Sequence, residues 1–217
     1  MALYTLTSNQ VLPDIQQPDE LVITNSGDVS MLSALVQVPE SEIIHRLAND
    51  HEAYVAYLQG IPVAFGWVAS GRARIGELNH DFILPNGNRY LWNFRTLEAY
   101  RGRGIYPALL QAIINDQRGR AKQYWIIHAP ENKSSQQGIR KAGFRFLGQL
   151  GLNKEGQLAL EARYMRLTEK MLAHEMGMPT DRGKVLPCWN CHSPYLKKRS
   201  VYCCTPSIVP IKSSVHL

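Results

Sequence analysis

The sequence predicts an α/β (α+β) domain built on a mixed, mostly antiparallel sheet of six to seven strands, with helices on both faces. Two observations lead to this fold class. An alternating pattern that starts near Leu91 runs through a glycine- and arginine-rich turn directly into an apolar-periodic helix that begins at Ile105. The segment from Tyr124 to His128 is almost continuously apolar, which is typical of a strand covered on both faces in a parallel pair.

The first half of the chain predicts a strand, two helices and a hairpin. Residues 1–19 are polar and contain two prolines, so they predict an N-terminal arm or an added edge strand. Residues 70–88 are less regular and end in a loop. The expected elements are the strand Leu21–Thr24, the helices Val29–Val36 and Ser41–Leu47, and the strands Ala53–Leu58 and Ile61–Ala69, joined at Gln59-Gly60.

The second half predicts a strand–helix–strand–helix unit followed by a closing hairpin. The glycine- and arginine-rich turn joins the first strand and helix of this unit. In order, the expected elements are the strand Arg89–Leu97, the helix Ile105–Gln117, the strand Tyr124–His128, the helix Asn132–Ala142, and the strands Phe144–Leu152 and Gln157–Leu167.

The net charge of +6 belongs to the end of the chain. Six of the 24 Lys and Arg residues follow Asp181, the last acidic residue, so residues 1–181 hold 18 basic and 18 acidic residues. This distribution argues against a nucleic-acid-binding main domain. No apolar run approaches the ~20 residues of a membrane span. The N-terminus has no secretory pattern, so we expect a cytoplasmic location and no membrane partner.

The turn before Ile105 has the properties of an anion cradle. The first N–H groups of a helix have no intrahelical acceptor and carry a partial positive charge. Gly102 and Gly104 allow a phosphate to approach the backbone, and Arg101 and Arg103 add positive charge. The alternative is an arginine-rich surface turn without a ligand, because short motifs of this kind also occur by chance.

Three motifs in this order resemble the GNAT superfamily of acyl-CoA-dependent N-acetyltransferases. They are R-G-R-G-I-Y-P-A-L-L from Arg101, W-I-I-H-A-P-E-N-K-S-S from Trp125 and I-R-K-A-G-F from Ile139. The first matches the family pattern of Arg or Gln, two residues, Gly, one residue, and Gly or Ala. The second and third provide an Asn at a helix start, Asn132, and a Gly-Phe pair at its end. The resemblance covers roughly residues 20–167.

The resemblance implies acetyl-CoA as cofactor and assigns residues to it. A bulge in the family separates the two parallel strands, and the pantetheine arm lies in the gap. Backbone groups of Leu97 to Tyr100 would contact the arm, with Asn132 on the opposite side. Lys133 and Arg140 are candidates for the adenosine phosphates, or simply solvated helix charges. The implied cofactor-binding residues are Leu97, Glu98, Ala99, Arg101, Gly102, Arg103, Gly104, Ile105, Tyr106, Asn132, Ser135 and Arg140.

Two positions depart from the family pattern. Tyr106 replaces a small residue, so its ring is expected to crowd the phosphate or lie over it. Pro107 follows it and is tolerated in the first turn of a helix. Many members use a tyrosine before the Gly-Phe pair as general acid to the departing thiolate, and Ile139 stands at that place here. A Gly104→Glu substitution is expected to abolish cofactor binding without affecting the fold.

His128, Glu98 and Asn93 are the candidate catalytic residues. His128 ends its strand near the expected gap, and its ordinary pKa of ~6.5 suits proton transfer; the alternative is a structural histidine. Glu98 lies next to the predicted thioester; the alternative is a carboxylate that caps Arg101. Trp92 and Asn93 alternate along the strand, so one of the two is expected to face the acceptor. A backbone N–H near Leu97 or Glu98 is the expected oxyanion donor.

The last part of the chain contains all four cysteines. Residues 168–184 predict a short helix and a linker, and residues 185–217 a basic, cysteine-rich tail. Cys188 and Cys191 form a Cys-x-x-Cys knuckle, and Cys203 and Cys204 supply two more sulfurs. Cytoplasmic proteins disfavour disulfides, which favours a structural zinc site over oxidised thiols. His192 could replace one of the sulfurs, and free thiols remain an alternative.

Together these features predict an acetyl-CoA-dependent N-acetyltransferase. The transfer would go to a primary amine of a small molecule or peptide by direct attack in a ternary complex, and the protein could form a homodimer. One alternative is a non-catalytic acyl-CoA-binding module, which the missing tyrosine favours. Another is an interaction protein that acts through its basic tail on an acidic partner or nucleic acid.

Overall fold

The computed structural model describes residues 1–186, so the predicted zinc site and all but the first two residues of the predicted tail lie outside the described residues. Two 3₁₀ turns, Gly76–Leu78 and Glu98–Tyr100, interrupt the regular elements. The elements are β1 (Ala2–Thr7), β2 (Leu21–Ser26), α1 (Val29–Val36), α2 (Glu40–Ala48), β3 (His51–Leu58), β4 (Ile61–Ala69), β5 (Arg72–Ile75), β6 (His80–Ile83), β7 (Asn88–Thr96), α3 (Ile105–Gln117), β8 (Gln123–His128), α4 (Lys133–Lys141), β9 (Arg145–Leu152), β10 (Leu158–Ala162) and α5 (Leu167–Glu175).

Eight strands form the main sheet in the order β10-β9-β1-β8-β7-β4-β3-β2. Every neighbouring pair is antiparallel except β7 and β8, which confirms the predicted parallel pair. The expected number of six to seven strands in this sheet was too small by at least one. Residues 70–88, expected to be irregular, contain a second, two-stranded sheet of β5 and β6.

The extra strand is β1, which lies inside the sheet between β8 and β9. The alternative of an edge strand for residues 1–19 is therefore wrong. Ala2 pairs with His128 on one side and with Gln149 on the other. Thr5 is buried, and its hydroxyl donates to the Tyr124 carbonyl at 2.8 Å. The hydrogen bond allows a polar residue to occupy the middle of the sheet without an unpaired hydroxyl.

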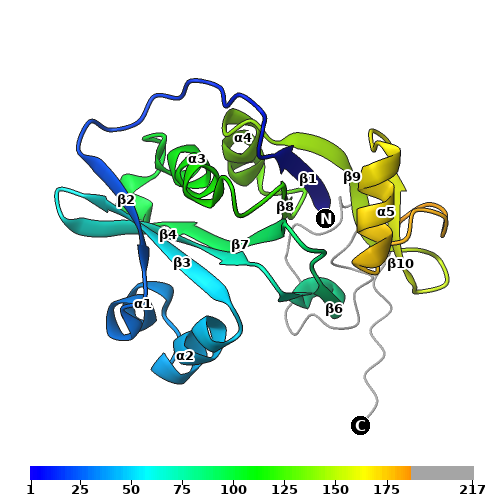
Figure 1. Ribbon diagram of the computed structural model, residues 1–217, viewed down its shortest axis with the longest axis horizontal. Helices are drawn as coiled ribbons and strands as arrows, with labels where there is room; N and C mark the ends of the chain where they lie inside the picture. Colours follow the sequence, from blue (N-terminus) through cyan, green and yellow to red (C-terminus); the bar gives the residue numbers. More distant parts are fainter. Residues whose placement is uncertain (187–217) are drawn as a thin grey trace, which may run out of the picture.

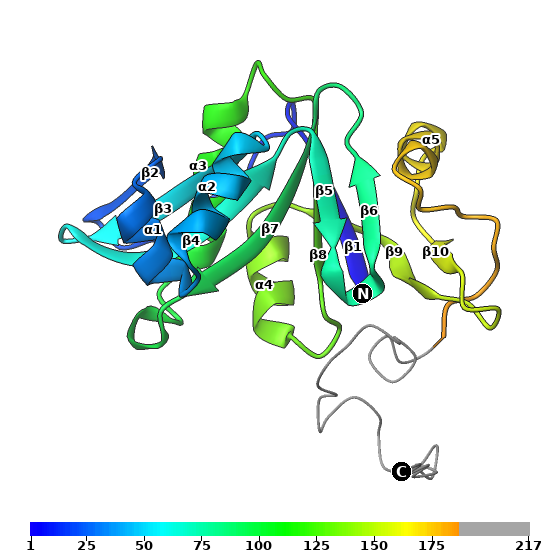
Figure 2. The ribbon, with the colours of Figure 1, turned by 90° about the horizontal axis from the view of Figure 1, so that it is seen from below.

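Helices cover the two faces of the sheet in different ways (Figures 1 and 2). On one face α3 and α4 pack over a core that includes Tyr4, Leu109 and Tyr124. On the other face α1 and α2 cover β3 and β4, while β5, β6 and α5 cover the region of β1, β8 and β9. The predicted arrangement of helices on both faces is confirmed.

A bulge in β7 separates the two parallel strands. Between the pairs Phe65–Arg95 and Trp67–Trp92, β7 has one residue more than β4. Asn93 takes a left-handed conformation at this point, with φ 51°. The pairing of β7 with β8 runs from Asn88 to Leu91 and stops before the bulge. The strands therefore diverge beyond Leu91, as the family resemblance predicts.

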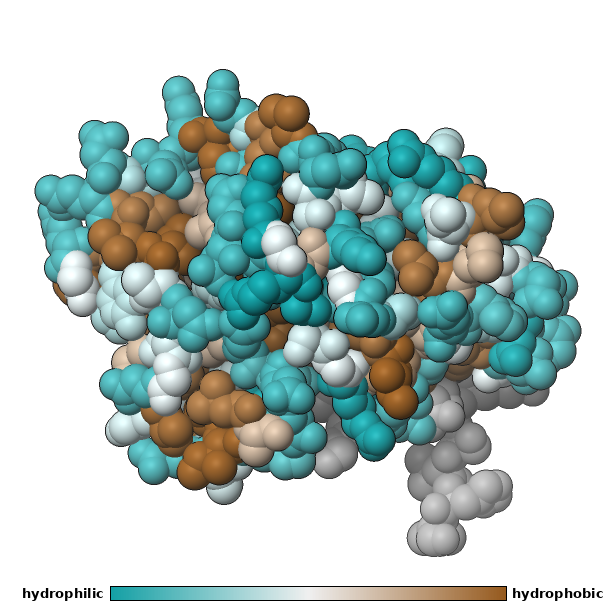
Figure 3. Space-filling view, viewed as in Figure 1, coloured by the Kyte–Doolittle hydropathy of each residue, from teal (hydrophilic) through white to brown (hydrophobic). Residues whose placement is uncertain are grey.

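The surface carries a few exposed apolar side chains. In Figure 3, brown side chains gather at the lower left, over α1 and α2, and Ile44 of α2 is 55% exposed. Within residues 1–186, no helix is both long enough and apolar enough to span a bilayer.

Candidate active site

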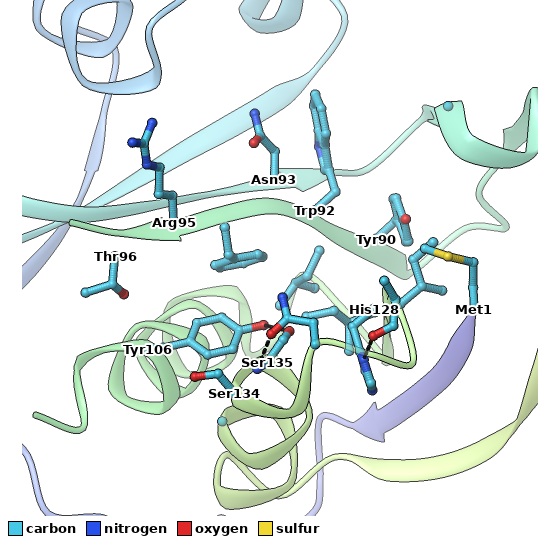
Figure 4. A pocket seen from close by; sticks show the side chains of 18 of the residues that line it. Met1, Tyr90, Trp92, Asn93, Arg95, Thr96, Tyr106, His128, Ser134 and Ser135 are labelled. Carbon is cyan, nitrogen blue, oxygen red and sulfur yellow. Dashed lines mark hydrogen bonds between the residues drawn. The ribbon is translucent and has the colours of Figure 1, made fainter. Parts of the chain in front are cut away.

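A cavity of about 1100 Å³ passes through the gap between β7 and β8. On the α3 and α4 side its lining includes the glycine turn and the start of α4. On the α2 side it includes residues of α2, β3 and β5. Figure 4 shows that Trp92, Asn93 and Arg95 point from β7 to one side of the sheet, whereas Thr96, Tyr106 and Ser135 lie on the other side. The cavity therefore joins two chemically different walls.

The glycine turn presents free backbone donors to the first wall. Gly102 and Gly104 both have φ 78°, and Gly104 is the N-terminal cap of α3. The amides of the first turn of a helix have no intrahelical acceptor. The turn lines the cavity, so these donors can meet an anion there.

Two arginines of the turn fold back onto the preceding segment. The Arg101 Nε atom donates to the Thr96 carbonyl at 3.2 Å, and its Nη1 atom lies 3.9 Å from the Glu98 carboxylate. Arg103 donates to the Ala99 carbonyl at 3.3 Å and lies over the Tyr100 ring at 5.4 Å. Arg101 lines the cavity, whereas Arg103 is outside its lining.

The structure brings seven of the predicted cofactor residues to the cavity and leaves five outside its lining. Leu97 belongs to the second group, and its N–H already donates to the Val63 carbonyl at 2.8 Å. It therefore cannot serve as the expected oxyanion donor. The residues that line the cavity are Arg101, Gly102, Gly104, Ile105, Tyr106, Asn132 and Ser135, and those outside its lining are Leu97, Glu98, Ala99, Arg103 and Arg140.

Thr96, and not Leu97, has its backbone groups turned away from β4. Opposite residues in an antiparallel pair of strands alternate between hydrogen-bonded and non-hydrogen-bonded pairs. Because Leu97 is hydrogen-bonded to Val63, the next pair, Thr96 and Ala64, is a non-hydrogen-bonded pair. The N–H and C=O of Thr96 are consequently turned away from β4, toward the gap. Thr96 lines the cavity, as does Lys141 at the end of α4, and the sequence analysis had identified neither.

The ring of Tyr106, a residue of α3, packs against Gly138 of α4. A Cβ atom built at Gly138 would be 2.3 Å from Tyr106 Cδ1, so the ring occupies the space that this glycine leaves open. The ring centre is 5.5 Å from that of Phe94, and the hydroxyl is 3.5 Å from Ser135 Oγ (Figure 4). Burial raises the pKa of Tyr106 well above its ordinary value.

Asn132 begins α4 as the sequence predicted. Its side-chain oxygen accepts from the Ser135 N–H at 2.9 Å, which caps the helix. The amide NH₂ group of Asn132 is left for other partners, and the residue lines the cavity.

Gly104 is a poor position for the substitution that the sequence suggested. A Cβ atom there would lie 2.1 Å from the Gln16 carbonyl oxygen, so Gly104→Glu would disturb the packing of the N-terminal segment. The expectation of an intact fold is therefore wrong. A Cβ atom at Gly102 would meet no atom within 4 Å, so Gly102 is the better position for a test.

The model of the acetyltransferase (GNAT) family matches residues 28–144, which is more than half of the 217-residue chain. The chain belongs to the acetyltransferase (GNAT) family. The matched range contains the glycine turn, the bulge and α4, all of which contribute residues to the lining of the cavity. No curated protein matches the chain.

Solved structures resemble this family member at low identity. A GCN5-related N-acetyltransferase from Kribbella flavida is 16% identical over 67% of this chain and 53% of its own, with a TM-score of 0.43, so the chain spans about half its length. A GNAT family acetyltransferase from Elizabethkingia anophelis with acetyl-CoA bound is 16% identical over 63% of this chain and 83% of its own, with a TM-score of 0.47.

The position of the usual general acid is closed in this GNAT protein. Ile139 has no exposed surface and belongs to the core beneath α3 and α4. Several residues that line the cavity carry hydroxyls, and Tyr106 and Ser135 are among them.

The three catalytic candidates take different places. His128 lines the cavity but is 5% exposed, and Nδ1 lies 2.7 Å from the Ala129 carbonyl and Nε2 3.4 Å from the Tyr4 hydroxyl. Burial lowers its pKa. The Glu98 side chain is 92% exposed, outside the cavity lining, and pairs with Arg101. Asn93 lines the cavity at the bulge.

The bulge changes the expected alternation on β7. Trp92 and Asn93 were expected on opposite faces, but both line the cavity and point to the α2 side (Figure 4). A bulge places two consecutive residues opposite one, which returns the second side chain to the same face. No group of three or more His, Cys, Asp or Glu side chains in the described part of the chain could hold a metal ion.

Proposed function

We propose that this protein transfers an acetyl group from acetyl-CoA to a primary amine by direct attack in a ternary complex. The observation that carries the proposal is the cavity through the gap between β7 and β8. The free amides of the glycine turn lie on one wall, and residues of α2, β3 and β5 form the other, which we call the acceptor wall. Two substrates that enter from opposite faces can meet at the bulge. Holding both in place supplies much of the acceleration in reactions of this kind.

The residues of the first wall fit acetyl-CoA. The amides that follow Gly102 suit a pyrophosphate, and Arg101 and Lys141 add positive charge at the cavity. The Thr96 N–H, which faces away from β4, and the amide NH₂ group of Asn132 suit the peptide-like pantetheine arm. When bound, acetyl-CoA supplies an acetyl thioester.

The chain offers groups for each part of the transfer. The amine nitrogen forms a C–N bond and loses a proton as the C–S bond breaks, and the sulfur leaves with the bonding electron pair and takes up a proton. We assign the Thr96 N–H to the thioester oxygen and the Tyr106 hydroxyl to the sulfur. Because burial raises its pKa, Tyr106 stays protonated at neutral pH and can donate. His128 remains a candidate proton carrier.

The decisive experiment combines binding and turnover. Calorimetric titration should show acetyl-CoA binding, and thiol release should depend on an added amine. Binding without thiol release for any amine in a broad panel would favour the non-catalytic alternative, which the burial of Ile139 supports. Absence of binding would contradict both and leave an interaction protein. A cytoplasmic location and a homodimer remain predictions from the sequence.

A further inference from the structure

Four buried polar side-chain atoms lack a hydrogen-bond partner in the described part of the chain, and all four belong to one cluster. They are Arg46 Nη1, His51 Nδ1, Trp67 Nε1 and Trp92 Nε1. The Arg46 guanidinium carbon lies 4.7 Å from the centre of the Trp92 ring and 5.1 Å from that of Trp67. The His51 ring centre lies 5.2 Å from that of Trp92. Buried polar groups normally have partners, so such a concentration indicates a missing one.

The cluster forms part of the acceptor wall. Arg46, His51 and Trp92 line the cavity, while Trp67 lies behind them and has no exposed surface. They come from α2, β3, β7 and β4, so only the folded chain brings them together. Thr96, on the opposite wall, also belongs to β7, but it lies on the other side of the sheet from Trp92 (Figure 4), so the cluster is a separate subsite of the same cavity.

Three of the four atoms are hydrogen-bond donors. Arg46 is always charged, and its side chain is 10% exposed. Its Nε atom donates to the Glu42 carboxylate at 3.0 Å, which leaves Nη1 for another acceptor. A carboxylate only accepts hydrogen bonds, and its two oxygens match the planar fork of a guanidinium. The indole N–H of Trp92 can add a further bond to the same group.

The fourth atom is an acceptor. His51 Nε2 lies 2.9 Å from the Arg72 carbonyl, which only accepts, so Nε2 carries the hydrogen and Nδ1 is bare. Burial lowers the pKa of His51, and the positive charges of Arg46 and His45 lower it further. Nδ1 can therefore accept from an ammonium or amine N–H.

We propose that the acceptor is an amine that also carries a carboxylate, of the amino-acid class. Arg46 and Trp92 hold the carboxylate, and the amine faces His51. The ammonium gives one proton to His51 Nδ1, which returns it to water, and the nitrogen lone pair becomes free for attack. This inference rests on the proposed function, because it names the acceptor of that transfer.

The first test compares amino acids with their own carboxamides. Thiol release is measured with saturating acetyl-CoA for small, aromatic and basic amino acids and for their carboxamides. For each pair, the pH is chosen so that the same fraction of the amine is uncharged in the amino acid and in the carboxamide. We expect kcat/KM to favour the best amino acid by roughly 10- to 100-fold, the range of a charge-assisted hydrogen bond. Equal values for every pair would overturn the proposal.

Variants locate the effect. Arg46→Gln should remove the preference for the carboxylate, and Trp92→Phe, which keeps an aromatic ring, should reduce it. Arg95→Gln is the matched control, because it removes the same charge from an exposed cavity residue that donates to Gln37 at 2.8 Å. It should keep the preference. Acetyl-CoA affinity should be unchanged in all three. Loss of the preference in Arg95→Gln alone would overturn the assignment.

A binding measurement separates this inference from the proposed function. Ligand-observed NMR compares N-acetyl amino acids with their carboxamides on the wild type and on Trp92→Phe, without any turnover. Carboxylate-dependent binding that weakens in the variant supports the subsite even if acetyl-CoA fails to bind. Acetyl transfer to amines together with equal binding of both ligand forms would overturn the subsite and leave the proposed function intact.

Discussion

At the scale of single residues, Tyr106 is the side chain to which we assign the role of general acid. The family pattern has a small residue at this point and a tyrosine at the position of Ile139. In this protein the ring of Tyr106 fits against Gly138, where any larger residue would collide with it. The hydroxyl reaches the cavity from α3 in place of α4. The proposed acid group would therefore come from α3, and a small residue, Gly138, lies on α4.

Tyr106→Phe should lower kcat by roughly 10²-fold, because a positioned general acid contributes about 10²- to 10⁴-fold. The ring and its packing on Gly138 are kept, so KM for acetyl-CoA should change little. Steady-state thiol release measures both constants. Ser135→Ala is the matched control, since it removes a neighbouring hydroxyl 3.5 Å away without removing the acid. An unchanged kcat in Tyr106→Phe would assign the proton to another group.

The histidines predict a dependence of stability on pH. Burial lowers the pKa of His51, His80 and His128. Below the ordinary histidine pKa of about 6.5, these three histidines are protonated in the unfolded chain but stay neutral in the folded chain. Their contribution to the free energy of unfolding is therefore fully present above that pH and is lost as the pH falls. Urea denaturation at about pH 7.5 and about pH 5.5 should show a lower free energy of unfolding at the acid value. In His128→Gln the decrease should be smaller.

At the scale of elements, the glycine turn depends on conformation more than on side chains. Gly102→Asp places a negative charge where the cofactor phosphates are proposed to bind, in open space and at φ 78°. We expect acetyl-CoA affinity to fall by at least about 10-fold, with a loss of stability of about 1–2 kcal/mol from the left-handed backbone.

Gly60 provides the matched control for this change. It has φ 77°, lies in the turn between β3 and β4, and also has no atom within 4 Å of an added Cβ. Gly60→Asp should therefore cost similar stability in thermal or urea denaturation and leave acetyl-CoA affinity unchanged in calorimetry. Equal affinities of the two variants would mean that the turn does not bind the cofactor.

Most elements could be predicted because their signals are local. Turn glycines, capping residues and apolar periods located α3, α4 and the parallel pair to within a few residues. The bulge at Asn93 was expected only from the family resemblance, and its consequence for Trp92 was not. The cluster of Arg46, His51 and Trp92 combines three elements, so no short segment of the sequence carries its pattern.

At the scale of the whole molecule, the tail remains defined by its sequence alone. Four cysteines that include one Cys-x-x-Cys pair predict about one zinc ion per full-length chain. Elemental analysis of protein purified without added metal should detect it, and Cys188→Ser combined with Cys191→Ser should abolish it. Because a four-sulfur site has no open position, the double variant should bind acetyl-CoA as the wild type does. A metal-free wild-type protein would favour free or oxidised thiols.

The N-terminal strand decides whether the molecule folds as one unit. β1 joins β8, which borders the gap next to β7, to the β9–β10 hairpin, so its loss would separate the sheet into two parts. Leu3 is 1% exposed and contacts the core of β8, β9 and α5. Leu3→Ala should therefore lower the free energy of unfolding by about 2–5 kcal/mol, as is typical of buried leucines.

Val11, in the same N-terminal region, is 88% exposed and gives the contrasting case. Val11→Ala should change the free energy of unfolding by no more than about 0.5 kcal/mol. Urea denaturation followed by tryptophan fluorescence and by circular dichroism would measure both variants. If residues 1–19 were a loosely attached arm, Leu3→Ala would behave as Val11→Ala does. An interior strand predicts that only Leu3→Ala causes a large loss in the free energy of unfolding. The transitions followed by fluorescence and by circular dichroism should then coincide.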